Sequence, residues 1–140
     1  MNSVILQIAS KYVRALLLIF ALIVLFRGHN HPGGGFIGGM LAGLSVAYRG
    51  FAYQQEEVRN NTKIQPEYYI AFGFFLILVS MVPSLIMGHD LMTGEWLKLN
   101  TFLGQIKLGT PLIFDVGVFS AVIGVTILFM FSLNRQNLWK

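Results

Sequence analysis

The sequence predicts an all-α integral membrane protein with about four transmembrane helices. Of its 140 residues, 55% are hydrophobic and 11% are charged, whereas an ordinary soluble domain carries roughly 25% charged residues. The mean hydropathy is +0.66, and the apolar residues form long blocks, not the apolar stripe of a soluble helix. The composition therefore argues against a soluble globular protein. Since there is no cysteine, disulfides, thiolate nucleophiles and Cys-based metal sites are excluded.

Four apolar blocks approach the length of about 20 residues that a spanning helix needs. Pro83 lies near the end of the third block, where it is expected to kink the helix or to mark its end. Polar connectors over residues 54–67 and 88–108 separate the later blocks. We therefore predict a single membrane domain over residues 1–140. Its spans are placed approximately at residues 10–27, 34–53, 67–87 and 110–133.

Basic residues at the ends of the apolar blocks predict how the chain is oriented. With four spans, both termini lie on the same side of the membrane, and Arg27, Lys98 and Lys107 fall on the opposite side. The remaining seven basic residues fall on the side of the termini: Lys11, Arg14, Arg49, Arg59, Lys63, Arg135 and Lys140. Because Lys and Arg are concentrated in cytoplasmic loops, the termini are predicted to be cytoplasmic.

The most specific local feature is the segment GHNHPGGGFIGG, residues 28–39, between the first and second spans. Its proline and glycines allow the chain to reverse tightly. Glycine pairs four residues apart, Gly34 with Gly38 and Gly35 with Gly39, would let a neighbouring helix approach closely. A second interpretation is that the exposed amides at the start of the second helix, at the positive end of its dipole, shape the energetics of a passing ion.

Asp115 is the only ionisable residue within the fourth span. At 1.5 Å per residue it lies roughly 9 Å inside the start of this span. A carboxylate at membrane depth is costly unless it is protonated, paired or hydrated, so it is a candidate functional residue. The alternative is an aspartate that caps a helix or anchors a neighbouring chain. The predicted topology places Asp115 in the same half of the membrane as the glycine segment, which allows a shared polar cluster.

Three histidines raise the question of a metal site. His29 and His31 are two residues apart, and His89 and Asp90 are predicted on the same side of the membrane. Without further ligand spacing this is weak evidence, and we predict no metal. His29 is still a candidate for proton handling, because an imidazole titrates near neutral pH.

The sequence offers no recognisable enzyme site. A Ser/His/Asp set, a phosphate-binding loop and a pair of catalytic carboxylates do not occur in a convincing form. We therefore predict that the chain is not an enzyme and that it needs no cofactor.

The glycine segment also carries a family resemblance. GHNHPGGGFIGG after a first span, with a closing span that opens GTPLIFDVGVFSAVIG, resembles the B subunit of Mrp-type (multiple resistance and pH) multisubunit Na+/H+ antiporters. The resemblance covers nearly the whole chain in length, span number and motif order. The acidic position of the family falls on Asp115. Its glycine motif falls on His29, Asn30, Pro32, Gly33, Gly34, Gly35 and Phe36.

The resemblance implies a function and partners. The chain would be a small multi-pass subunit, in the plasma membrane of a prokaryote, of a complex that exchanges cytoplasmic Na+ for external protons. Its implied partners are large complex I-like subunits and other small membrane subunits, with no nucleic acid involved. Asp115 and His29 are then the candidates for contact with the ion path. The alternative is a purely structural assembly subunit, without ion contact, of an antiporter or of a related membrane-bound hydrogenase-like complex.

Overall fold

Four helices make up most of the protein. The computed structural model describes residues 4–28, 33–53, 65–90, 92–101 and 104–136. The helices are α1 (Val4–Arg27), α2 (Gly34–Ala52), α4 (Pro66–Ile86) and α5 (Thr110–Gln136). The predicted helical fold class is therefore confirmed. Pro83 lies inside α4, three residues before the helix ends, as expected of a proline that marks a helix end.

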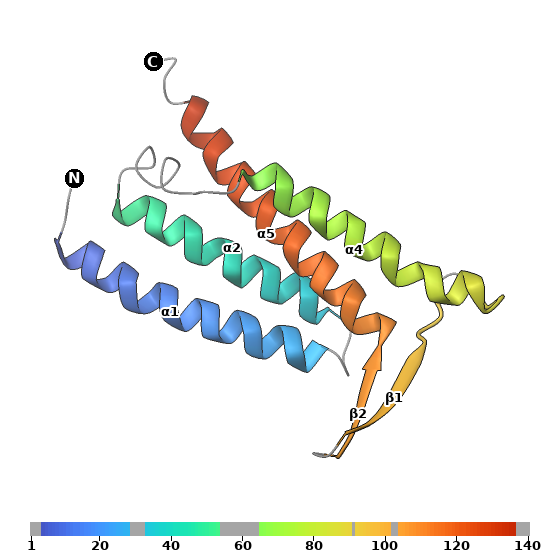
Figure 1. The fold of residues 1–140 in the computed structure, drawn as a ribbon. Coiled ribbons are helices and arrows are strands. Elements are labelled where there is room, and N and C mark those ends of the chain that lie inside the picture. Colours follow the sequence, from blue (N-terminus) through green and yellow to red (C-terminus); the bar gives the residue numbers. More distant parts are fainter. Residues whose placement is uncertain (1–3, 29–32, 54–64, 91, 102–103, 137–140) are drawn as a thin grey trace.

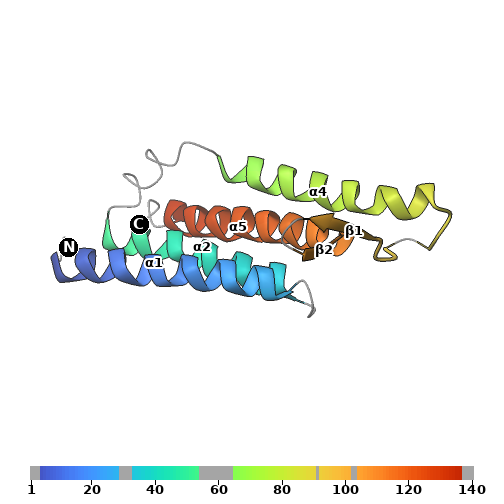
Figure 2. The same ribbon diagram turned by 60° about the horizontal axis from the view of Figure 1, so that its bottom comes forward.

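The helices lie side by side in the order α1, α2, α5, α4, which is not their order in the chain (Figure 1). α2 packs between α1 and α5, and α5 packs between α2 and α4. The turned view shows the same row, with α1 and α4 at its two edges (Figure 2). The start of α1 and the end of α5 lie at the same end of the row. α5 therefore holds the two halves of the chain together.

Three of the helices in the described part of the chain are long and apolar enough to cross a membrane. The qualifying segments are Gln7–Arg27, Pro66–Ile86 and Thr110–Ser132. α2 has 19 residues, so it extends about 28 Å, close to the roughly 30 Å of a bilayer core. Its glycines lower its hydropathy. Since it lies between two apolar helices, we retain a fourth span at α2 as a prediction.

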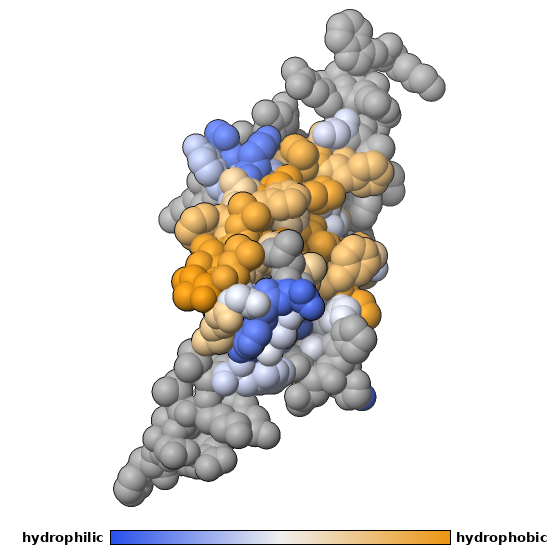
Figure 3. All heavy atoms as spheres, turned by 90° about the vertical axis from the view of Figure 1, so that its right-hand side faces the viewer, coloured by the Kyte–Doolittle hydropathy of each residue, from blue (hydrophilic) through white to orange (hydrophobic). Residues whose placement is uncertain are grey.

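The outer surface of the helix row is strongly apolar. Phe20, Phe75 and Phe129 are 54%, 61% and 64% exposed, whereas Ile127 is among the few large apolar residues that are buried. Figure 3 shows hydrophobic residues over much of the face seen from one side of the molecule, with smaller hydrophilic patches beside them. Exposed apolar surface on this scale favours contact with lipid or with other subunits over contact with water.

The predicted polar connector over residues 88–108 instead contains a β-hairpin. β1 (Trp96–Thr101) pairs antiparallel with β2 (Gly104–Gly109), with Leu97 opposite Leu108 and Leu99 opposite Ile106. The connector prediction is therefore wrong for these strands. The signal was present, because apolar and polar residues alternate along both strands, and this alternation is typical of β-structure.

Thr110 fixes the base of the hairpin to α5. Its backbone N–H donates to the carbonyl oxygen of Glu95 at 3.0 Å, and its hydroxyl accepts from the Glu95 N–H at 3.1 Å. We expect Thr110→Val to speed amide hydrogen exchange across residues 95–109 of the purified protein about fivefold, because a net hydrogen bond contributes about 1 kcal/mol. Thr110→Ser keeps the hydroxyl and is the control. Unchanged exchange in the valine variant would contradict this role.

Candidate functional site

The candidate site lies at the start of α2, where the glycine segment meets α5. Gly33 precedes the helix with a φ of 96° and a ψ of 0°, a left-handed conformation that glycine adopts without steric cost. Its carbonyl accepts from the N–H of Ile37 at 3.1 Å. Gly33 therefore begins α2 without a side-chain cap. The motif residues before it, His29, Asn30, His31 and Pro32, lie outside the described residues.

One glycine face of α2 packs on α1. Gly34 lies against the backbone of Gly28, and a Cβ atom at Gly38 would lie only 2.8 Å from the carbonyl oxygen of Ala21. Real Cβ atoms essentially never approach within 3.0 Å of such an atom. Side chains at these positions would therefore force α1 and α2 apart, as expected for small-residue packing between membrane helices.

A second glycine face of α2 packs on α5. Gly35 lies directly against the backbone carbonyl of Asp115, and a Cβ atom at Gly39 would lie 2.8 Å from the carbonyl oxygen of Phe119. Gly43 continues the same face one turn further along. The structure thus brings together the two features that the sequence singled out, the glycine segment and the fourth-span aspartate.

Asp115 lies near the start of α5 and is partly buried. It is five residues past Thr110, about 7.5 Å along the helix. The first amides of α2 lack partners within their own helix, and the positive end of the helix dipole lies there. Gly35 belongs to this first turn, so the environment of Asp115 favours a negative charge. Phe36, the last residue of the motif, is 52% exposed and belongs to neither glycine face.

The sequence analysis missed a third close contact, between α4 and α5. Gly73 and Gly117 pack backbone to backbone, and a Cβ atom at Gly117 would lie 2.8 Å from the carbonyl oxygen of Gly73. The Ser120 hydroxyl donates to the carbonyl oxygen of Tyr69 at 2.9 Å. Single glycines within otherwise apolar spans were the available signal. Because α5 is tightly packed on two sides, the position of Asp115 is well fixed.

The structure gives His89 a local partner. Its Nδ1 lies 2.6 Å from Oε1 of Glu95, just before the hairpin, and the two side chains are 53% and 20% exposed. Within residues whose placement is described, no group of three or more His, Cys, Asp or Glu side chains could hold a metal ion. His29 and His31 fall outside that part of the chain. His89 therefore takes part in a hydrogen bond at the base of the hairpin.

Comparison with known proteins agrees with this architecture. A family model described as a domain related to the MnhB subunit of Na+/H+ antiporter matches residues 5–128. The B-type antiporter subunit of Bacillus subtilis, from a Na(+)/H(+) antiporter, is 32% identical over 137 residues, which cover 97% of this chain and 96% of that protein.

A solved structure shares the fold. A chain in the structure of the Mrp complex from Dietzia sp. DQ12-45-1b matches with a TM-score of 0.71 and 29% identity. The match covers 89% of this chain and 13% of that chain, so this chain corresponds to a small part of a much longer one. With the family match over most of its length, the chain belongs to the family of domains related to the MnhB subunit of Na+/H+ antiporters.

Proposed function

We propose that this chain is a small membrane subunit of a multisubunit Na+/H+ antiporter and helps to form its ion-translocating membrane module. It acts as part of a transporter, not as an enzyme, in the plasma membrane of a prokaryote. The family match and the bacterial antiporter subunit of nearly equal length support this function. The similarity to part of an Mrp complex supports the other subunits of such a complex as its partners.

The contact between Gly35 and Asp115 carries the proposed role in the ion path. It holds the one acidic residue of α5 beside the first turn of α2, where the helix dipole stabilises negative charge. A carboxylate at this depth in the membrane is costly without such compensation, and it attracts a cation or a proton. One carboxylate offers too few oxygen ligands for a dehydrated Na+. Other subunits therefore complete the site.

A purely structural subunit is the competing function. The glycine faces of α2 would serve it equally well, because they hold α1 and α5 in close contact. The two functions differ in what remains when transport is lost, since a structural subunit affects transport only through assembly. The relative named above is an antiporter subunit, which supports an antiporter and not a hydrogenase-like complex as the parent assembly.

Omission of this chain tests the proposed function. Inverted vesicles from antiporter-deficient cells that express the complex without this chain are expected to lose Na+-dependent proton movement, and a separate copy of the chain should restore it. Native gels of the same vesicles report assembly. Loss of transport with the remaining subunits still assembled supports a place in the ion module. Loss of both supports the structural function, and undiminished transport contradicts both.

A further inference from the structure

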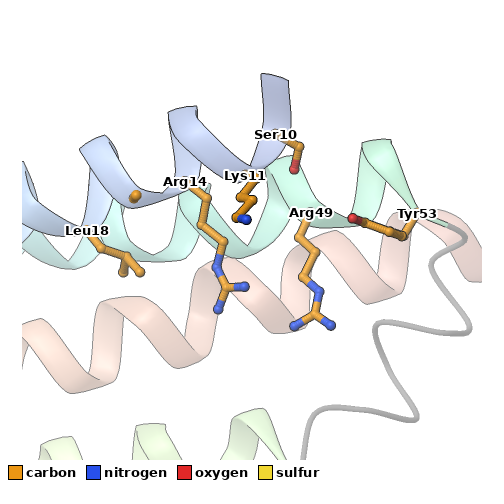
Figure 4. Close-up of a pocket in the computed structure, with 7 residues that line it drawn as sticks. Ser10, Lys11, Arg14, Leu18, Arg49 and Tyr53 are labelled. Carbon is orange, nitrogen blue, oxygen red and sulfur yellow. The ribbon is translucent and has the colours of Figure 1, made fainter. Parts of the chain in front are cut away.

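A basic groove lies between α1 and α2, far from the glycine segment. Its volume is about 440 Å³, within the range of 300–1,000 Å³ typical of small-molecule sites. The close-up view shows the side chains around it (Figure 4). The groove is lined by Ser10, Lys11, Arg14, Ala15, Leu18, Arg49 and Tyr53.

Three cationic side chains gather in the basic groove. The guanidinium groups of Arg14 and Arg49 extend in the same direction, with Lys11 between them in this view (Figure 4). The Nε of Arg14 is buried and has no hydrogen-bond partner. Among the residues described by the structure, no acidic side chain forms an ion pair with these three cations. Because like charges repel and a buried charge without a partner is costly, this arrangement calls for an anion.

The depth of the groove indicates where the anion comes from. Arg14 is 13 residues before Arg27 along α1, and Arg49 is 15 residues after Gly34 along α2, so both lie about 20 Å from the other end of their helices. In a bilayer core of about 30 Å, they are inside the far boundary but within reach of its headgroups, because long basic side chains extend toward the interface. At this level, phospholipid phosphates are the most abundant anions. Basic pockets between membrane helices bind anionic lipid headgroups.

We propose that the basic groove binds the phosphate group of an anionic phospholipid. The planar fork of an arginine suits phosphate oxygens, and two arginines with Lys11 provide more donors than a single carboxylate from a neighbouring subunit would accept. Ala15 and Leu18 are exposed beside these cations, and they offer apolar contact to the glycerol and acyl portions of a lipid. The proposal does not depend on the direction or ion specificity of transport.

Lipid retention by the purified complex tests the proposal. The delipidated complex is titrated with mixed micelles that contain phosphatidylglycerol or phosphatidylcholine, and native mass spectrometry measures the bound lipid. We expect Arg14→Gln combined with Arg49→Gln to weaken phosphatidylglycerol retention about tenfold, since each basic residue near a membrane surface contributes about 1 kcal/mol. Arg27→Gln removes a charge from the opposite end of α1 and should leave retention unchanged. Lys11→Gln is a milder variant, expected to weaken retention about fivefold, in case the double variant does not assemble.

Several outcomes would overturn the proposal. Equal retention of the two lipids at wild type and at both groove variants would remove the lipid site, and full competition by inorganic phosphate would replace it with a site for a free anion. Release of a neighbouring subunit by the double variant, with lipid unchanged, would assign the groove to an acidic protein partner. If only Glu56→Gln combined with Glu57→Gln creates a preference for phosphatidylglycerol, the chain's own connector is the occupant.

Discussion

Asp115→Asn is expected to lower Na+-dependent proton movement in inverted vesicles by about tenfold or more while the complex stays assembled. Asparagine keeps the size and much of the hydrogen-bonding capacity of aspartate but cannot carry its charge. If Asp115 attracts a cation or proton in the membrane, the loss of this charge removes the interaction, and a tenfold effect corresponds to about 1.4 kcal/mol. The measurement compares initial rates of proton movement at several Na+ concentrations, with a native gel of the same vesicles.

Two further variants show whether the effect of Asp115→Asn is specific to that carboxylate. Asp115→Glu keeps the charge and should retain part of the transport activity. Glu67→Gln removes an exposed carboxylate at the start of α4, and it should transport like the wild type. Wild-type transport by an assembled Asp115→Asn complex would remove Asp115 from the ion path and favour the structural function.

Gly35→Ala is expected to reduce the amount of intact complex about tenfold. The added Cβ would meet the backbone carbonyl of Asp115, which cannot move aside as a flexible side chain can. Overpacking of this kind costs about 1–3 kcal/mol, although alanine is favoured over glycine in an isolated helix by about 1 kcal/mol. A loss of stability would therefore report the helix contact and not the helix propensity. Native gels and thermal unfolding of the purified complex measure it.

The control for Gly35→Ala adds volume where α4 has space. Ala71 is exposed on α4, so Ala71→Val should leave the amount of intact complex close to that of the wild type. A Gly35→Ala complex with wild-type abundance and thermal stability would show that α2 and α5 can separate slightly at little cost. The position of Asp115 would then be less firmly fixed than the contact with Gly35 implies.

Features that depend on local sequence were predictable. Length and hydropathy were enough to place helices at four segments, because a membrane helix satisfies all its backbone groups internally and needs only an apolar surface. The segment around Gly33 pointed to a tight turn into a helix, and the structure has a left-handed Gly33 at that position. The hairpin over residues 96–109 was missed, although its alternating pattern is local, because the segment was judged by its polarity and not by its period.

The tertiary structure alone decided which helices touch. Hydropathy is nearly uniform around an apolar helix, so it does not fix how each helix is rotated or which neighbour it meets. Glycine backbones in contact decide this: α2 meets α1 through one face and α5 through another, and Gly35 lies on Asp115. The basic groove likewise joins residues that are far apart in the sequence, Arg14 and Arg49. The sequence by itself determined the membrane helices, the family and the candidate residues, whereas packing between distant backbones determined the site that these residues form.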